Sequence, residues 1–477
     1  MKQLQITFIL ALLLTTISAL TIYGQSDPPP KTAPTLKNGT GNQKKETDNN
    51  ENKETEKTGE ETKRNDDSLY EANQKPQGRI VSREQVKQNE SAIGRFLLAP
   101  FRAMAPAINR RLTKFETDRE LNKLGVFLAN PYIHPTIGGL GEGSGFGAGV
   151  YVSTADKLSE NYKLFASGHA TLNRYAELRS GIEIAPKKWA DGKVQFNLSG
   201  RYLLRPEEDY FGSGPNSFRS KQVSYFRREQ GARFEANWQA FSRIKIGAFS
   251  DFSYNSITDG NDLKVAVISE KFSSHNTPGF SRKVSLIDNG IFVEYEGRDE
   301  PNNPHAGTFA KLSISSMDGL GKASNYGAIN YDLDARGYLP LGSKRRVLAV
   351  RFLGMFKDLK GDSTVPFFRL ARLGDSETLR GYDSYRFQGL NAVHLNIEYR
   401  YKLVQRSETG GLGGIEAILF SDLGQVFNNK EELSIKNVKA TWGGGLQFMS
   451  QKNVSFAVLY AVSPERNRLI FRFGKTF

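Results

Sequence analysis

The sequence of 477 residues contains no cysteine. This absence excludes a disulfide-stabilised fold, a cysteine-ligated zinc or iron–sulfur site, a thiol nucleophile and a lipoprotein anchor. Hydrophobic residues make up only 38% of the chain, which excludes a polytopic helical membrane protein. A transmembrane β-barrel remains possible, because its strands alternate apolar and polar side chains and its average hydropathy resembles that of a soluble protein.

Three segments precede the main part of the chain. Residues 1–24, with Lys2 before an apolar run, are interpreted as a secretory signal peptide, and an uncleaved anchor helix is the alternative. Residues 25–79 are rich in Pro, Lys, Glu, Asn and Thr and have almost no large apolar side chains, which predicts a disordered linker. The linker's charge is nearly balanced, so the formal excess of +14 lies downstream.

Residues 80–131 show a helical pattern that Pro100 and Pro106 interrupt. Apolar residues recur at three- and four-residue spacing, and arginines fill positions between them: Leu97, Phe101, Met104, Ile108, Leu112 and Phe115. This amphipathic basic segment either packs on the rim of the following domain or lies on anionic lipid. Basic residues further along the chain are spread through alternating segments, so no nucleic-acid partner is expected.

From residue 132 to the end the hydrophobic period changes to two. A single strand of a soluble β-sandwich has the same alternation of apolar and polar residues. About sixteen such segments after a signal peptide, however, favour a membrane barrel. We therefore predict an all-β fold, a 16-stranded antiparallel transmembrane β-barrel over residues 132–477. The predicted strands begin near residues 133, 144, 161, 174, 192, 223, 241, 284, 307, 325, 346, 391, 414, 439, 453 and 468.

An even strand count places both ends of the barrel on the periplasmic side. Every connection from an odd to an even strand is then extracellular. The long connections, near 205–222, 254–283, 357–390 and 423–438, all belong to this class.

Four motifs occur in order in this region: YEGRDEPNNPHAGTF from Tyr295, RLGDSETLRGYDSYRFQG from Arg372, FSDLG from Phe420 and FRFGKTF at the C-terminus. Together they resemble the BamA/TamA-type outer-membrane assembly superfamily, the bacterial surface-antigen barrel. The resemblance covers roughly residues 132–477.

The resemblance implies that the sixth extracellular loop folds back into the lumen with Arg380, Gly381 and Tyr382 at its tip. It also implies that Arg380 pairs with Asp422 on the thirteenth strand. Glu398, on the twelfth strand, is the second candidate partner, since the alternation points it into the lumen. An arginine in a narrow lumen needs a carboxylate to hold it. The alternative is that Arg380 only lines a polar channel wall.

Two further features concern the ends of the barrel. Phe471, Phe473 and Phe477 lie on the predicted lipid face, and the resemblance implies that they form the signal by which assembly machinery inserts the barrel; ordinary girdle aromatics are the alternative. Glycines alternate from Gly139 to Gly149, which predicts either a weak seam between the first and last strands or a tight turn.

No catalytic motif is found, so neither an enzyme nor a metal or cofactor site is expected: G-x-S-x-G and H-E-x-x-H are both missing. Residues 26–130 lack the strands of a polypeptide-transport-associated domain, which predicts a barrel-only member. Two functions remain open. One is insertion or transport of protein or lipid, with unfolded outer-membrane proteins or lipids as clients. The other is a structural surface-antigen barrel or passive pore in the outer membrane.

The linker gives a first testable prediction. Because residues 26–79 have no core, limited proteolysis of the purified chain should remove them and leave the barrel intact. Mass spectrometry of the resistant fragment measures this outcome, and protection of residues 26–79 would contradict the predicted disorder.

Overall fold

The computed structural model describes residues 130–141, 143–154, 158–186, 192–262, 264–404, 412–450 and 455–473. The predicted signal peptide, the linker and nearly all of the basic helical segment lie outside these residues, as does Phe477. Among the described residues, no helix is long and apolar enough to cross a membrane.

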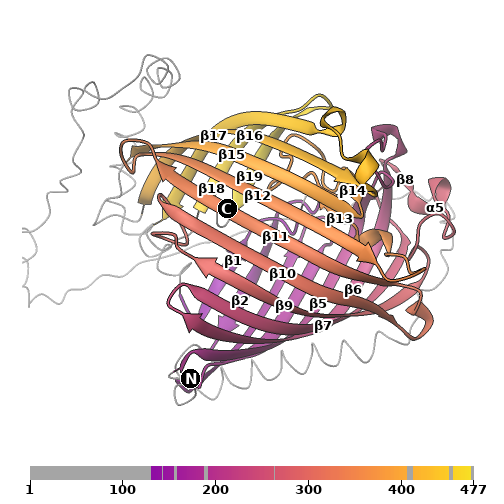
Figure 1. The fold of residues 1–477 in the computed structure, drawn as a ribbon, viewed down its shortest axis with the longest axis horizontal. Helices are drawn as coiled ribbons and strands as arrows, with labels where there is room; N and C mark the ends of the chain where they lie inside the picture. The colour runs from indigo at the N-terminus through magenta and orange to yellow at the C-terminus, as the bar shows by residue number, and fades with distance from the viewer. Residues whose placement is uncertain are drawn as a thin grey trace, which may run out of the picture.

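One sheet of 17 strands forms most of the described chain and wraps around a common axis (Figure 1). One member, β8 (Ala266–Val267), has two residues and runs parallel to β6, so sixteen strands form the wall. These are β1 (Ile133–Ile137), β2 (Gly147–Ser153), β3 (Tyr162–Thr171), β4 (Ala176–Ile184), β5 (Val194–Tyr210), β6 (Val223–Phe241), β7 (Ile244–Asp259), β9 (Lys283–Glu296), β10 (Gly307–Leu320), β11 (Gly327–Pro340), β12 (Arg346–Leu359), β15 (Asn391–Val404), β16 (Leu412–Phe427), β17 (Lys439–Ser450), β18 (Ser455–Val462) and β19 (Asn467–Phe473).

The strands confirm the predicted all-β class and strand count, and each begins within three residues of its predicted start. Each wall strand pairs antiparallel with the next wall strand in the chain. Successive connections therefore alternate between the two ends of the barrel. The connections 211–222, 260–282, 360–390 and 428–438 all lie at one end, which we name the long-loop end. The connections 242–243, 297–306 and 341–345 lie at the other, the short-turn end.

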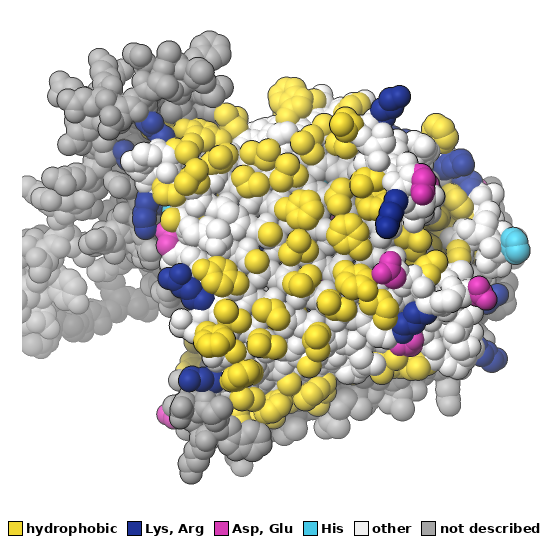
Figure 2. Space-filling view, in the orientation of Figure 1, with side chains coloured by type: hydrophobic (Ala, Val, Ile, Leu, Met, Phe, Trp, Pro, Cys, Tyr) yellow, Lys and Arg dark blue, Asp and Glu magenta, His cyan; other side chains and the backbone are white. Residues whose placement is uncertain are grey.

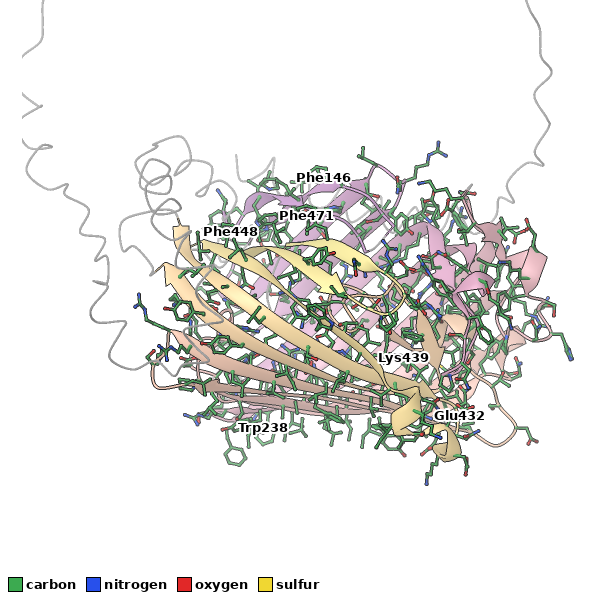
Figure 3. The ribbon with its side chains drawn as sticks, turned by 90° about the horizontal axis from the view of Figure 1, so that it is seen from above. Phe146, Trp238, Glu432, Lys439, Phe448 and Phe471 are labelled. Atoms are coloured by element: carbon green, nitrogen blue, oxygen red, sulfur yellow. The ribbon has the colours of Figure 1, made fainter. Side chains whose placement is uncertain are left out.

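The outer face of the wall is apolar, as the alternating pattern requires for contact with lipid. Figure 2 shows hydrophobic side chains across the middle of one face, with charged side chains towards both ends. Trp238 points away from the barrel near the short-turn end (Figure 3). Large apolar side chains exposed on the wall include Leu198, Phe234, Trp238, Ile246, Phe252, Ile291, Leu312, Phe352, Trp442, Tyr460, Leu469 and Phe471.

The inner face carries charged side chains that pair with each other. Arg201 on β5 donates to Asp251 on β7 at 2.7 Å, across the intervening strand β6. Arg351 on β12 donates to Asp334 on β11 at 3.0 Å. Such pairing satisfies charges that are partly removed from water.

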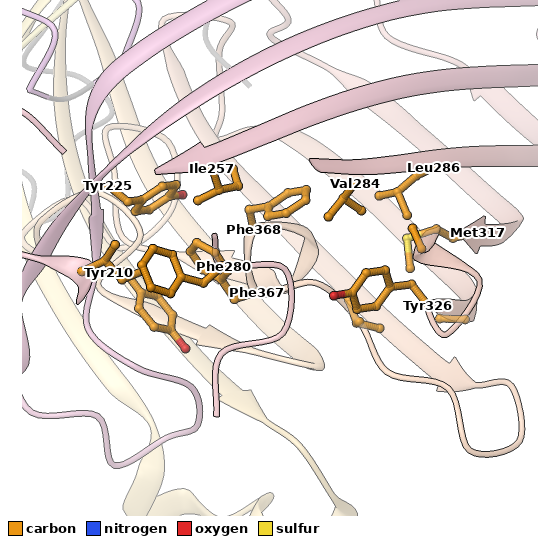
Figure 4. Packing of buried hydrophobic residues seen from close by; sticks show 14 of the residues in the cluster. Tyr210, Tyr225, Ile257, Phe280, Val284, Leu286, Met317, Tyr326, Phe367 and Phe368 are labelled. Atoms are coloured by element: carbon orange, nitrogen blue, oxygen red, sulfur yellow. The ribbon is translucent and has the colours of Figure 1, made fainter. Parts of the chain in front are cut away.

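The long-loop end is filled by an apolar cluster (Figure 4). Phe367 and Phe368, from the connection 360–390, pack inside the strand ends. The Phe367 ring lies 4.9 Å from the rings of Tyr210 and Tyr225, measured between centroids. Pairs of this kind contribute about 0.5–1.5 kcal/mol each beyond burial of their area. The first half of the connection therefore has its own core inside the mouth of the barrel.

The apolar outer face leads to a second prediction. The chain should fractionate with outer membranes, and the folded barrel should migrate faster in a detergent gel when unheated than after boiling, because its continuous hydrogen-bonded sheet resists detergent. Release from membranes by carbonate or high salt would contradict a membrane-spanning barrel.

Candidate functional site: the lumen loop and the seam

The connection between β12 and β15, residues 360–390, is named loop 6 because it is the sixth connection at the long-loop end. Two short strands, β13 (Ala371–Leu373) and β14 (Phe387–Gly389), pair inside it and bring its two halves together. Between them, the N–H of Tyr385 donates to the carbonyl of Gly374 at 2.7 Å. Gly374 has φ +99°, and a Cβ there would lie 2.4 Å from the carbonyl oxygen of Asp383. The tip of loop 6 is therefore a compact, closed segment.

Arg380 lies at this tip, and its side chain is almost completely buried. Its Nε and Nη2 donate to Asp422 Oδ2 and Oδ1 at 2.9 and 2.6 Å, and its backbone N–H donates to the same carboxylate at 3.1 Å. Its Nη1 donates to Glu398 Oε1 at 2.5 Å. The guanidinium carbon also lies 3.6 Å from the centroid of the Phe420 ring. We name Arg380, Asp422 and Glu398 the Arg380 site.

Neighbouring side chains complete the hydrogen bonding of both carboxylates. Asn396 and Thr441 each donate to Asp422, at 2.8 and 2.9 Å. Arg400 also donates to Glu398 at 2.7 Å, so Glu398 accepts hydrogen bonds from two arginines. Asp422 and Asn396 sit opposite each other in the β15–β16 register, and Thr441 sits opposite Asp422 on β17. The wall thus presents a preformed acceptor to the tip of loop 6.

The ionisation of Arg380 is fixed by these neighbours. Burial alone would lower the pKa of its guanidinium, but the carboxylates of Asp422 and Glu398 outweigh burial and raise that pKa above its ordinary value. Arg380 therefore keeps its charge, and loop 6 is held by a bidentate, charge-assisted contact.

The other predicted tip residues lie beside Arg380. Gly381 faces the turn between β18 and β19, and Tyr382 packs edge-to-face against Phe387 with 4.9 Å between ring centroids. Burial raises the pKa of the Tyr382 hydroxyl to about 12. Of the three predicted C-terminal aromatics, Phe471 is exposed on the lipid face. The side chains of Phe473 and Phe477 lie outside the described part of the chain.

The two end strands of the sheet are β1 and β19, and we name the boundary between them the seam. Over the described residues, β1 pairs only with β2, and β19 pairs only with β18. Strand β1 is also short, with five residues, whereas β6 has nineteen; seven residues of β19 are described. Four of the six alternating glycines, from Gly139 to Gly145, lie in the connection between β1 and β2 rather than in a strand. Gly141, Gly143 and Gly145 have positive φ, which fits the tight-turn interpretation.

The turn between β9 and β10, residues 297–306, has an internal organiser. Asp299 Oδ1 accepts hydrogen bonds from the N–H groups of Glu300, His305 and Ala306 at 3.0, 2.9 and 3.1 Å. Burial alone would raise the pKa of Asp299, but the N–H groups of His305 and Ala306 and the Lys344 ammonium outweigh burial and lower that pKa to about 2. The carboxylate is therefore charged at neutral pH and shapes the turn.

This turn reaches across the short-turn end of the lumen. His305 is buried, and its Nε2 lies 3.4 Å from Oε1 of Glu416 on β16. Strands β9 and β10 do not neighbour β16, so this contact passes through the interior. Sequence reasoning assigned no role to either residue, although the YEGRDEPNNPHAGTF motif contained His305. It also missed the contacts of the β18–β19 turn, since a charged turn carries no periodic signal.

Comparison with known proteins identifies the family. The model of the Omp85 superfamily domain matches residues 224–477, just over half of the chain. The chain belongs to the Omp85 superfamily. No curated protein matches it in a sequence search. The matched Omp85 region contains both loop 6 and the Arg380 site.

A solved structure shows the same fold at low identity. BamA from Haemophilus ducreyi lacking POTRA domains 1-3 is 16% identical, with a TM-score of 0.52, over 75% of this chain and 77% of that one. CdiB from Acinetobacter baumannii is 12% identical, with a TM-score of 0.46, over 72% of this chain and 59% of that one. CdiB from Escherichia coli is 15% identical, with a TM-score of 0.46, over 72% and 62%.

Family and fold together establish the general class. The chain is an outer-membrane β-barrel of the assembly and transport type, and its sixteen-stranded wall spans the membrane. Within the described residues, no group of three or more His, Asp or Glu side chains is placed to hold a metal ion.

Proposed function

We propose that this Omp85 barrel inserts or translocates protein or lipid at the seam between β1 and β19, while loop 6 closes the lumen. Two observations support the proposal: Arg380 at the tip of loop 6 contacts Asp422 and Glu398 of the wall, and the two seam strands lack mutual pairing in the described residues. Unpaired strand edges offer backbone donors and acceptors to an incoming strand. With loop 6 closing the lumen, a protein or lipid client crosses at the seam and not through the pore.

The clients that fit this geometry are unfolded outer-membrane proteins, which add strands to an open edge, or outer-membrane lipids. The proposal includes export by residues 1–24 as a signal peptide. It also includes insertion of this barrel by assembly machinery that recognises the C-terminal aromatics Phe471, Phe473 and Phe477. The exposed side chain of Phe471 is available on the lipid face for such recognition.

The alternative function is a passive pore or structural barrel. A polar cavity of about 440 Å³ beside loop 6 favours it, because ions could pass along a charged wall. The cavity is lined by residues that include Arg201, Arg233, Asp251, Asp288, Lys357 and Arg369.

Two measurements on the purified full chain separate these functions. In liposomes, the proposed function predicts faster membrane insertion of an unfolded outer-membrane barrel than in protein-free liposomes. In a planar bilayer, a plugged barrel gives little steady conductance, whereas a passive pore conducts steadily. Steady conductance without any acceleration of insertion would overturn the proposal.

A further inference from the structure

The tip of loop 6 contacts more than the Arg380 site. Its opposite side touches the last hairpin of the barrel, whose turn spans residues 463–466 between β18 and β19. Ser463 Oγ donates to the carbonyl of Gly381 at 2.8 Å. Arg468 Nη1 on β19 donates to the carbonyl of Arg380 at 3.2 Å and also to that of Tyr382.

Two ion pairs strengthen this contact. Arg386 donates through Nε and Nη2 to both carboxylate oxygens of Glu465, at 2.8 and 2.7 Å. Asp383 pairs with Arg466. The loop partners are the more buried members, with side chains 3% exposed for Arg386 and 7% for Asp383. Bidentate pairing of this kind fixes orientation as well as distance.

Close packing at Gly381 leaves no room for a larger residue. A Cβ at this position would lie 2.9 Å from Ser463 Cβ and 3.0 Å from the carbonyl carbon of Val462. Real Cβ atoms are seldom so close to a backbone atom, so the glycine lets loop 6 approach the last hairpin directly.

The connection between β5 and β6 joins the same assembly. Arg219 donates to Asp383 at 3.3 Å, and Arg386 donates to the carbonyl of Ser217 at 2.9 Å. We name the tip residues Gly381, Asp383 and Arg386, with Ser463, Glu465 and Arg466 of the last hairpin, the clasp.

We propose that the clasp positions the seam strand β19, so that loop 6 and the seam move as one unit. Strand β19 has hydrogen-bonded pairing on one side only, to β18, in the described residues. Its lateral position therefore depends on the contacts of the hairpin with the tip of loop 6, which the clasp and Arg468 supply. Displacement of loop 6 by an incoming chain would free β19, which couples lumen entry to seam opening. The coupling of lumen entry to seam opening rests on the proposed function, whereas the positioning of β19 by the clasp does not.

Hydrogen exchange of the purified full chain in detergent micelles tests the inference without any client. The first variant is Gly381→Ala, which drives the hairpin away without removing the Arg380 side chain. The second is Glu465→Gln with Arg466→Gln, which removes both ion pairs by changing their more exposed members. In both variants the amides of 467–473 should exchange about tenfold faster or more, while those of β6 and β7 stay unchanged.

Matched controls separate the clasp from general loosening. Gly337→Ala adds a methyl group where no atom lies within 4 Å. Lys430→Gln with Glu431→Gln makes the same charge change in another connection at the long-loop end. Should 467–473 exchange at the wild-type rate in both clasp variants, or no faster than in the controls, the clasp does not position β19. If a clasp variant loses heat-modifiable migration, Asp383→Asn decides by the same readout, because it removes the charge that pairs with Arg466 and Arg219 and leaves the hairpin's own residues unchanged. Absence of insertion activity in the wild-type chain would overturn the proposed function. The hydrogen-exchange result for residues 467–473 would still stand.

Discussion

Arg380→Ala is expected to release loop 6 from the lumen, raise single-channel conductance several-fold and expose residues 360–390 to protease. The substitution leaves the buried carboxylate of Asp422 without its cation and removes one of the two arginines that contact Glu398. Breaking a buried ion pair from one side costs about 3–5 kcal/mol, more than the pair contributes, because the remaining charge is stranded. Planar-bilayer recording and limited proteolysis measure the two effects.

Asp422→Ala should reproduce this phenotype, and the double variant should be no worse than either single variant, because the two residues act through one contact. Glu398→Gln should have a smaller effect, since Glu398 accepts one hydrogen bond from Arg380 whereas Asp422 accepts several.

Arg380→Lys is the matched control for charge. It keeps the cation but cannot make the bidentate contact, so an intermediate conductance is expected. Additive effects of the two alanine variants would show that Arg380 and Asp422 act independently. Unchanged conductance in all of these variants would show that loop 6 is not the plug, and the passive-pore function would gain support.

A disulfide across the seam is expected to abolish insertion activity while leaving conductance at its wild-type level. The chain has no cysteine, so engineered pairs are the only thiols present. Single cysteines placed along 133–137 and along 467–473 can be scanned for the pair that oxidises most completely. A covalent link then prevents β1 and β19 from separating, and the liposome insertion assay gives the readout.

The matched control is a disulfide within the last hairpin. Tyr460 and Leu469 lie directly opposite each other on β18 and β19, and both side chains are exposed on the lipid face. Tyr460→Cys with Leu469→Cys therefore introduces the same chemistry without closing the seam. Equal activity of the reduced and oxidised seam variants would contradict transport at the seam.

The strand count could be predicted because lipid on one side and charge on the other impose a period of two on every wall strand. Leu469 and Phe471 alternate with Arg468 and Arg472, and no tertiary information is needed to see it. The exact ends could not be predicted in the same way. The glycine alternation of β2 continues through Gly139–Gly145, which form a turn, because glycine adopts strand and turn conformations equally well.

The Arg380 site came from motif resemblance, whereas the surrounding contacts had no signal in the sequence. The pair of strands within loop 6, the docking of Phe367 in the mouth and the contact of His305 with Glu416 each join residues far apart in the chain. Period and composition describe local order and do not specify such contacts. The last hairpin illustrates this, since Glu465 and Arg466 look like ordinary turn residues.

The clasp also has a consequence for the order in which the barrel folds. The surface that receives the last hairpin is built by residues 381–386, some eighty positions earlier in the chain, and it exists only when loop 6 is already inside. The clasp can therefore form only when loop 6 and the last hairpin are both in place. We expect its formation to be a late, long-range step of folding, because it closes a large loop of chain.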